Sequence, residues 1–159
     1  MGGAISHYLE EDHVRIDEAL QRAASSAEGI EVTAYPEFRP ALLRHISMED
    51  KILLPAAQAA YGGLPLPRAA QLHLDHGALA ALLVPTPTKT IVDAIRTILG
   101  RHNTIEEGPG GVYEECEQLP GLDTDAVLAR LRVAPRVRMA PHSDSAIAME
   151  SMRSALRRA

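Results

Sequence analysis

The chain has 159 residues, about the length of one domain, a net charge of −5 and 46% hydrophobic residues without tryptophan. This aromatic-poor composition favours helices over aromatic-rich strands. The start of the chain has no basic segment followed by an apolar run, and no window approaches about eighteen uncharged apolar residues, which argues against export and against a membrane span. We therefore expect an all-α, cytoplasmic protein that does not interact with a membrane.

The first predicted helix spans residues 5–28, where apolar residues recur at helical spacing and Gly29 suits a C-terminal stop. His13 lies on its apolar stripe. Glu10 stands three residues before His13 and Asp17 four residues after it. Both are near enough on a helix surface to hydrogen-bond the imidazole or to join a metal site.

The second predicted helix begins between residues 33 and 40 and ends before the Gly- and Pro-rich break at 61–67. His45 and Glu49 lie four residues apart on its apolar stripe, and no Lys or Arg shares that stripe. A buried carboxylate without a partner costs on the order of 3 to 5 kcal/mol, so Glu49 requires a compensating cation. Pro55 is expected to kink the helix or to end its regular hydrogen bonding.

The third predicted helix covers residues 67–84 and carries His76 on its apolar stripe, with His73 one turn earlier. Side chains three residues apart are separated by about 60° around a helix, so both imidazoles can face one centre. Alternatively, one imidazole from this helix suffices, and His73 hydrogen-bonds a carboxylate outside the site.

The fourth predicted helix covers residues 89–107 and repeats the arrangement of the second, with His102 on the stripe and Glu106 four residues later. The Gly-Pro-Gly-Gly run at 108–111 cannot continue a regular helix. Residues 112–119 are therefore expected to form a new short segment that closes the bundle.

The last part of the chain differs in charge from the rest. Residues 1–119 hold 9 basic and 17 acidic side chains, whereas residues 120–159 hold 7 arginines and 4 acids. Periodicity predicts a short helix over 123–132 and a terminal helix capped by Ser143 or Asp144. The apolar positions of that terminal helix are Ile147, Met149, Met152 and Leu156.

We expect this basic extension, residues 120–159, to pack on the first domain or on a second subunit in a homodimer. Docking of an acidic partner is the alternative. An arginine cluster without aromatic residues is weak evidence for nucleic-acid binding, and no nucleic-acid partner is expected.

The four long predicted helices each place histidine near the middle of the apolar stripe. Facing core positions of an antiparallel bundle converge at one level. The candidate metal ligands are His13, His45, Glu49, His73, His76, His102 and Glu106. A tetrahedral zinc site uses at most four ligands, whereas seven imidazoles and carboxylates, two of them able to bridge, suit two metal ions. The sequence thus predicts an up-down-up-down four-helix bundle over residues 1–119 with a dinuclear site and additional C-terminal helical segments.

Five further polar residues stand near these positions. Asp50, Asp75 and Glu107 each adjoin a stripe residue but are expected to point away, as surface charges or as hydrogen-bond partners of the ligands. His7 and His142 are expected to be exposed to solvent.

Four stretches of the chain resemble one known family. Asp-His in the first predicted helix, HISMEDKILLPA in the second, LDH in the third and HNTIEEGPGGVY in the fourth resemble the hemerythrin family in its broad bacterial form, the HHE cation-binding domain. The resemblance covers residues 5–119 and implies a non-haem di-iron centre. It would make His13, His45, His76 and His102 terminal ligands, Glu49 and Glu106 bridges, and His73 a fifth imidazole.

The resemblance leads to a functional hypothesis: a di-iron protein that binds or senses oxygen, nitric oxide or peroxide at an open iron position. Imidazole-rich ligation with two carboxylates leaves few negative charges on the metals, which favours reversible binding or peroxide handling over more oxidising chemistry. The alternatives are an iron buffer or scavenger and a regulatory interaction protein that uses the basic extension. The sequence does not rank the three small ligands, and it leaves a peroxide-handling or ferroxidase-like side activity open.

Overall fold

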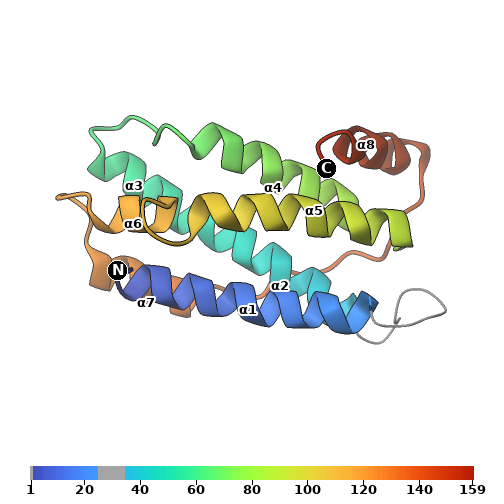
Figure 1. Cartoon of the computed structure of the whole chain (residues 1–159), viewed down its shortest axis with the longest axis horizontal. Coiled ribbons are helices and arrows are strands. Elements are labelled where there is room, and N and C mark those ends of the chain that lie inside the picture. The colour runs from blue at the N-terminus through green and yellow to red at the C-terminus, as the bar shows by residue number, and fades with distance from the viewer. Residues whose placement is uncertain (1, 25–34) are drawn as a thin grey trace.

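The structure is a computed structural model that describes residues 2–24 and 35–159 (Figure 1). Every regular element in these residues is a helix, which confirms the all-α prediction. The longest helices are α1 (Ala4–Ala24), α2 (Tyr35–Met48), α4 (Ala69–Leu83) and α5 (Lys89–Glu106). The helix stop predicted at Gly29 lies outside the described residues.

These four helices lie side by side along the long axis of the molecule (Figure 1). Helix α1 contacts both α2 and α5, and helix α4 contacts the same two helices. Each of the four long helices therefore contacts two of the other three, and the faces between them form the interior. None of the helices in the described part of the chain combines the length and the apolar composition that crossing a membrane requires.

The backbone after α2 changes its hydrogen-bonding pattern without breaking. A π-helical segment, η1 (Glu49–Leu53), follows α2 directly and leads into α3 (Leu54–Ala60). Pro55 lies in the first turn of α3, where its missing N–H removes a donor that a regular helix would use. The disturbance expected at Pro55 is thus present as a π segment just before it. Such segments are frequent at functional sites, and this one begins at Glu49.

A glycine turn follows α5 and leads into α6 (Val112–Glu117). Gly108 and Gly110 both have a φ of 75°, a conformation that other residues rarely adopt. A Cβ on Gly111 would lie 2.4 Å from the carbonyl oxygen of Glu106, so only glycine fits this close approach. The turn therefore places α6 back beside the end of α5.

Two further helices follow, α7 (Thr124–Arg132) and α8 (Ala146–Leu156). Helix α8 packs against α4 (Figure 1). Its Met152 is buried in the core. Two predictions for this helix are wrong. Its cap is Ser145, which accepts a hydrogen bond from the N–H of Ala148, because Asp144 instead accepts hydrogen bonds from Thr86. Ile147, predicted as an apolar contact, is 82% exposed.

The apolar residues form two clusters rather than one continuous core. One cluster includes Ile16 of α1 and Leu79 of α4, and the other includes Leu9 of α1 and Leu72 of α4. Along each of these helices the apolar stripe is interrupted between the two clusters by buried polar residues. The interruption falls at the level of His13, so the fold presents a polar layer between two apolar ones.

Candidate metal centre

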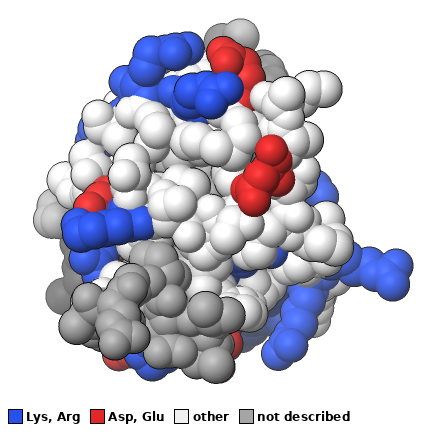
Figure 2. Space-filling view, turned by 90° about the vertical axis from the view of Figure 1, so that its right-hand side faces the viewer, with Lys and Arg blue, Asp and Glu red and all other residues white. Residues whose placement is uncertain are grey.

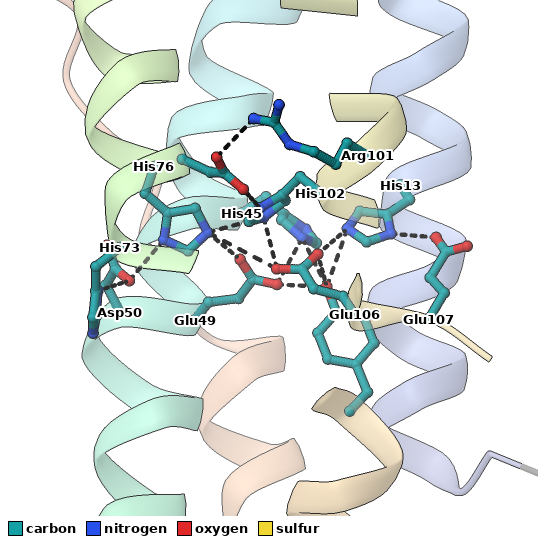
Figure 3. A network of polar contacts seen from close by, with 12 residues as sticks. His13, His45, Glu49, Asp50, His73, His76, Arg101, His102, Glu106 and Glu107 are labelled. Atoms are coloured by element: carbon teal, nitrogen blue, oxygen red, sulfur yellow. Dashed lines mark hydrogen bonds and ion pairs between the residues drawn. The ribbon is translucent and has the colours of Figure 1, made fainter. Parts of the chain in front are cut away.

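Imidazole and carboxylate side chains fill this layer (Figure 3). It contains one residue from each of α1, α2, η1 and α4, and two from α5. These residues are His13, His45, Glu49, His76, His102 and Glu106. The most exposed of them, His13, is only 6% exposed. The structure thus brings together six of the seven residues predicted as metal ligands.

The first donor group consists of His13, His45 and one oxygen each of Glu49 and Glu106. His45 Nε2 lies 3.2 Å from Glu49 Oε1, and His13 Nε2 lies 3.2 Å from Glu106 Oε2. All four donor atoms lie within 4.8 Å of one another, a spacing that ligands of one metal ion can have.

The second donor group consists of His76, His102 and the other oxygens of Glu49 and Glu106. His76 Nε2 lies 2.9 Å from Glu49 Oε2, and His102 Nε2 lies 2.7 Å from Glu106 Oε1. Each carboxylate therefore offers one oxygen to each group. This is the arrangement in which two carboxylates can bridge two metal ions.

The four imidazoles are all oriented in the same way. Each ring directs Nε2 into the centre, while its Nδ1 contacts a carboxylate outside it. The pairs are His13 with Glu107, His45 with Asp12 at 2.8 Å, His76 with Asp50 at 2.8 Å and His102 with Asp75 at 3.1 Å. An Nδ1–H that donates to a carboxylate leaves the Nε2 lone pair free for a metal and makes it more basic, as metal-bound histidines commonly require.

The carboxylate partners differ in part from those predicted. Asp75, which was left open as a surface charge or a hydrogen-bond partner, is fully buried and is a partner. Asp12 was not predicted, and the proposed neighbours of His13 were wrong: Asp17 is exposed and accepts a hydrogen bond from Gln21. The sequence did contain a signal for Asp12, because it continues a regular apolar pattern. That pattern consists of Ile5, Leu9, Ile16, Ala19 and Ala23.

Two arginines hold Asp75 in place. Arg101 Nη2 lies 3.1 Å from Asp75 Oδ1, and Arg158 Nε lies 2.6 Å from the same oxygen. Burial raises the pKa of Asp75, but the hydrogen bonds from Arg158 and His102 more than offset this and lower it. The C-terminal extension thus contributes one charge to the surroundings of His102.

His73 is the candidate ligand that the structure does not place in either buried group. Its side chain is 51% exposed, and its Nδ1 lies 3.0 Å from Asp50 Oδ1. Asp50 also accepts from His76, so His73 contacts the centre through this carboxylate and through an edge-on contact of its ring with the ring of His76. The predicted alternative for His73, hydrogen bonding to an outer carboxylate, agrees with this geometry. His7 and His142 are exposed, as predicted.

Tyr113 of α6 is a member of the centre that sequence reasoning missed. Its hydroxyl oxygen lies 2.5 Å from Glu49 Oε1, 3.0 Å from Glu106 Oε2, 3.0 Å from His13 Nε2 and 3.3 Å from His45 Nε2. Burial and the charges of Glu106 and Glu49 raise the pKa of Tyr113 well above its ordinary value. Helical periodicity could not predict this residue. The glycine turn separates α6 from α5, so the spacing of apolar residues in α5 does not show which side of α6 faces the centre.

The centre attracts positive charge. Burial alone lowers the pKa of His45, but the charge of Glu49 and the hydrogen bond to Asp12 raise it to about 10. Burial also lowers the pKa of His76, and the adjacent carboxylates of Asp50 and Glu49 raise it to about 10. Two buried carboxylates are thus balanced by cations, either protons on the rings or metal ions.

The second donor group fits a metal better than it fits hydrogen bonding. Glu49 Oε2 and Glu106 Oε1 are buried and make no hydrogen bond, because the nearby rings of His76 and His102 are not aligned to donate one. The Nε2 atoms of those rings lie only 3.2 Å from each other. Imidazole nitrogen and carboxylate oxygen are ligands that suit iron, manganese or zinc. The residues present therefore fit a cation that all four donors share.

A surface pocket between α1 and α5 lies next to the centre. It has a volume of about 490 Å³ and is lined by Ile16, Leu20, Arg96 and Asn103, among others. His13 also lines it, so the pocket reaches one member of the first donor group. The pocket offers a small molecule a route to within one side chain of the centre.

Comparison of the chain with models of protein families, with curated proteins and with solved structures finds no match. The function must therefore be argued from the centre itself.

Proposed function

We propose that this protein is a non-haem di-iron protein of the hemerythrin-like type that binds or senses oxygen, nitric oxide or peroxide. The observation that carries the proposal is the pair of four-residue donor groups that share both oxygens of Glu49 and both oxygens of Glu106. One metal ion cannot use six residues arranged in this way, whereas two ions bridged by two carboxylates can.

The hemerythrin-like proposal includes the arrangement of the helices. We take α1, α2, α4 and α5 as an up-down-up-down four-helix bundle of residues 1–119, with residues 120–159 as an extension. The contacts of each long helix with two others support this architecture. In such bundles, metal ligands project inward from facing helices at one level, as the six residues do here.

Iron would supply an open coordination position for the small ligand, and the chain controls what surrounds that position. His13, His45, His76 and His102 hold their Nε2 atoms inward because four carboxylates fix the opposite ring nitrogens. The apolar clusters on both sides keep bulk water away from this layer. Only two carboxylates lie among the metal donors, which favours reversible binding or peroxide handling.

The ligand burial argues against an iron buffer as the main role. All six residues are at most 6% exposed, so release of iron would require the helices to separate. A buffer needs faster exchange than this geometry supports. Iron scavenging is therefore the second candidate function.

A regulatory role for the basic extension has less support. Helix α8 uses Met152 and Ala155 to pack on the rest of the chain, and Arg158 is paired with Asp75. On the end of the molecule shown in Figure 2, the Lys and Arg side chains stand at separate places rather than in one continuous patch. We propose a cytoplasmic protein without a nucleic-acid partner.

Absorption spectroscopy tests the ligand-binding proposal. The reduced, iron-loaded protein should be exposed separately to oxygen, nitric oxide and peroxide under otherwise identical conditions. At least one of them should change the spectrum in a saturable way, with one small molecule bound per chain. An iron-loaded protein whose spectrum responds to none of the three would contradict the proposal and favour the scavenger.

A further inference from the structure

We infer that Tyr113 is a protein ligand of one metal position, the one held by His13 and His45, and that the two positions are therefore chemically different. This inference rests on the proposed function, because it needs metal at both donor groups. It assigns a fifth protein donor to the first group and leaves the second group with four.

The position of the phenol oxygen carries the inference. It lies within 3.3 Å of one atom from each member of the first group, namely His13, His45, Glu49 and Glu106. A phenol has one hydrogen to donate and two lone pairs, so it cannot satisfy four such neighbours as a hydrogen-bonding group alone. An oxygen at the common point of four donor atoms is where a further ligand of a shared ion belongs.

The chain holds Tyr113 firmly at this point. Its side chain is 1% exposed, and its neighbours Val112 and Cys116 are buried in the same cluster. The N–H of Ser6 donates to Glu117 Oε1 at 2.8 Å, which ties the end of α6 to the start of α1. The close approach at Gly111 fixes the other end. Both ends of this short helix are thus held by contacts with neighbouring parts of the chain.

Among the residues that the structure describes, the second group has no counterpart of Tyr113. Its nearest additional imidazole, His73, is half exposed and contacts Asp50 on the outside of His76. A fifth protein donor is therefore present on one side of the shared carboxylates only. An ion at His76 and His102 keeps more positions for an external ligand than an ion at His13 and His45.

The coordination step is balanced without a redox change. The bond from the phenol oxygen to the ion forms, the O–H bond breaks, and the proton leaves to solvent. A bound cation reverses the local preference for the neutral phenol, as it does for other ligands with high pKa values. The iron is taken in its ferric form, which is supplied by aerobic loading.

The test is the absorption and resonance Raman spectrum of the ferric, iron-loaded full chain. A phenolate bound to ferric iron should give a charge-transfer band and enhanced ring vibrations. The chain has three other tyrosines: Tyr8, whose hydroxyl donates to the Leu131 carbonyl, Tyr35 in the apolar core, and the partly exposed Tyr61. None of them is part of either donor group, so a phenolate signal identifies Tyr113.

Tyr113→Phe should abolish the band while about two irons per chain remain, since four donors are left at the first position. Tyr8→Phe is the matched control and should keep the band. If the wild-type protein holds two irons and shows no phenolate signal, Tyr113 is a hydrogen-bond donor only and the inference is wrong. A band that survives in Tyr113→Phe overturns it as well.

Mössbauer spectra of the wild-type protein add a readout that does not depend on a variant folding. Two unlike iron environments in equal amounts are expected, and a single environment contradicts the inequivalence. Wild-type protein that holds no iron would refute the proposed function itself, and this inference with it. Iron at two per chain without a phenolate band refutes only the inference.

Discussion

At the scale of single residues, the centre depends on carboxylates that do not belong to either donor group. Asp12 fixes the ring of His45, and Asp75 fixes the ring of His102 while it is itself held by Arg101 and Arg158. The same ring nitrogen is used each time, so the orientation of every imidazole follows from an outer hydrogen bond. Removal of such a partner should weaken metal binding without removing a ligand.

Asp12→Asn tests this dependence. The amide keeps the size of the side chain but loses its charge, so iron affinity should fall about 10- to 100-fold, as is typical for the outer partners of metal-bound histidines. Competition with a chelator measures the affinity. Asp17→Asn on the exposed side of α1 is the control and should leave it unchanged. Equal affinities for the two variants would show that Asp12 does not orient His45.

A second prediction concerns the protonation of the His45 and His76 rings in protein from which a chelator has removed the metal. The pKa values of His45 and His76 are raised from 6.5 to about 10 in the fold. Their contribution to stability is therefore complete below pH 6.5 and is lost as the pH rises toward 10. Urea unfolding should give a smaller free energy at pH 9.5 than at pH 6.5.

Iron-loaded protein is the comparison for this measurement. Metal ions take the place of the ring protons there, so the free energy of unfolding should decrease less between pH 6.5 and pH 9.5. A free energy of unfolding that rises from pH 6.5 to pH 9.5 in the metal-free protein would show that the rings are neutral.

Residue-level prediction succeeded where a polar side chain kept the phase of the apolar stripe. His13, His45, His76 and His102 were found in this way. The spacing left two roles open for His73, and its half-exposed side chain, which contacts Asp50, agrees with the role of hydrogen-bond partner to an outer carboxylate. Asp12 was not predicted, because a charged residue next to a histidine is usually on the surface. Its spacing to the apolar residues of α1 indicates that it is buried.

At the scale of elements, the two irregular segments are the ones that shape the centre. The π segment η1 begins at Glu49, and the glycine turn delivers α6 and Tyr113. The proline and glycine residues indicated that regular helix is interrupted at these places. They did not indicate which side chain the interruption would present, because that depends on how the chain packs after the turn.

Gly111→Ala tests the glycine turn. The new Cβ would lie 2.4 Å from the Glu106 carbonyl oxygen and 2.5 Å from that of Glu107, so the backbone must shift. We expect a loss of about 1–3 kcal/mol in the free energy of unfolding, by analogy with the cost of overpacking a close contact. Gly100→Ala, in the interior of α5 with nothing within 4 Å of its Cβ, should instead gain about 0.5–1 kcal/mol.

Urea unfolding of both variants in the presence of iron gives these values. If Gly111→Ala is as stable as the wild-type protein, the turn does not constrain α6, and the placement of Tyr113 has another cause.

At the scale of the whole molecule, the chain is organised as a polar layer between two apolar clusters. The C-terminal extension packs on it at two places, with α7 against α1 and η1 and with α8 against α4. The all-helical class followed from composition and periodicity. The extension was expected to pack on the first domain or on a second subunit, and its charge and periodicity could not distinguish between the two. In the structure, Met152 joins the larger cluster and Arg158 contacts Asp75.

Deletion of residues 143–159 tests the role of the extension. It should expose the apolar face of α4 and lower the melting temperature by at least about 4 °C, since burial of one methionine side chain contributes about 1.5–3 kcal/mol. Iron should still bind at saturating concentration, because the six residues of the two donor groups and Tyr113 all precede residue 120. Calorimetry measures the melting temperature, and elemental analysis measures the iron content.

Arg158→Ala separates the ion pair from the packing and should leave the melting temperature closer to that of the full chain. A truncated protein with an unchanged melting temperature that no longer binds a cellular partner would show that the extension is an interaction module.

The central claim is that two metal ions share Glu49 and Glu106, and the iron content per chain tests it most directly. Protein produced in iron-replete medium and freed of loosely bound metal should contain about two irons per chain by elemental analysis, because each of the two donor groups has its own pair of imidazoles. A reproducible content of one zinc and no iron would contradict the di-iron centre.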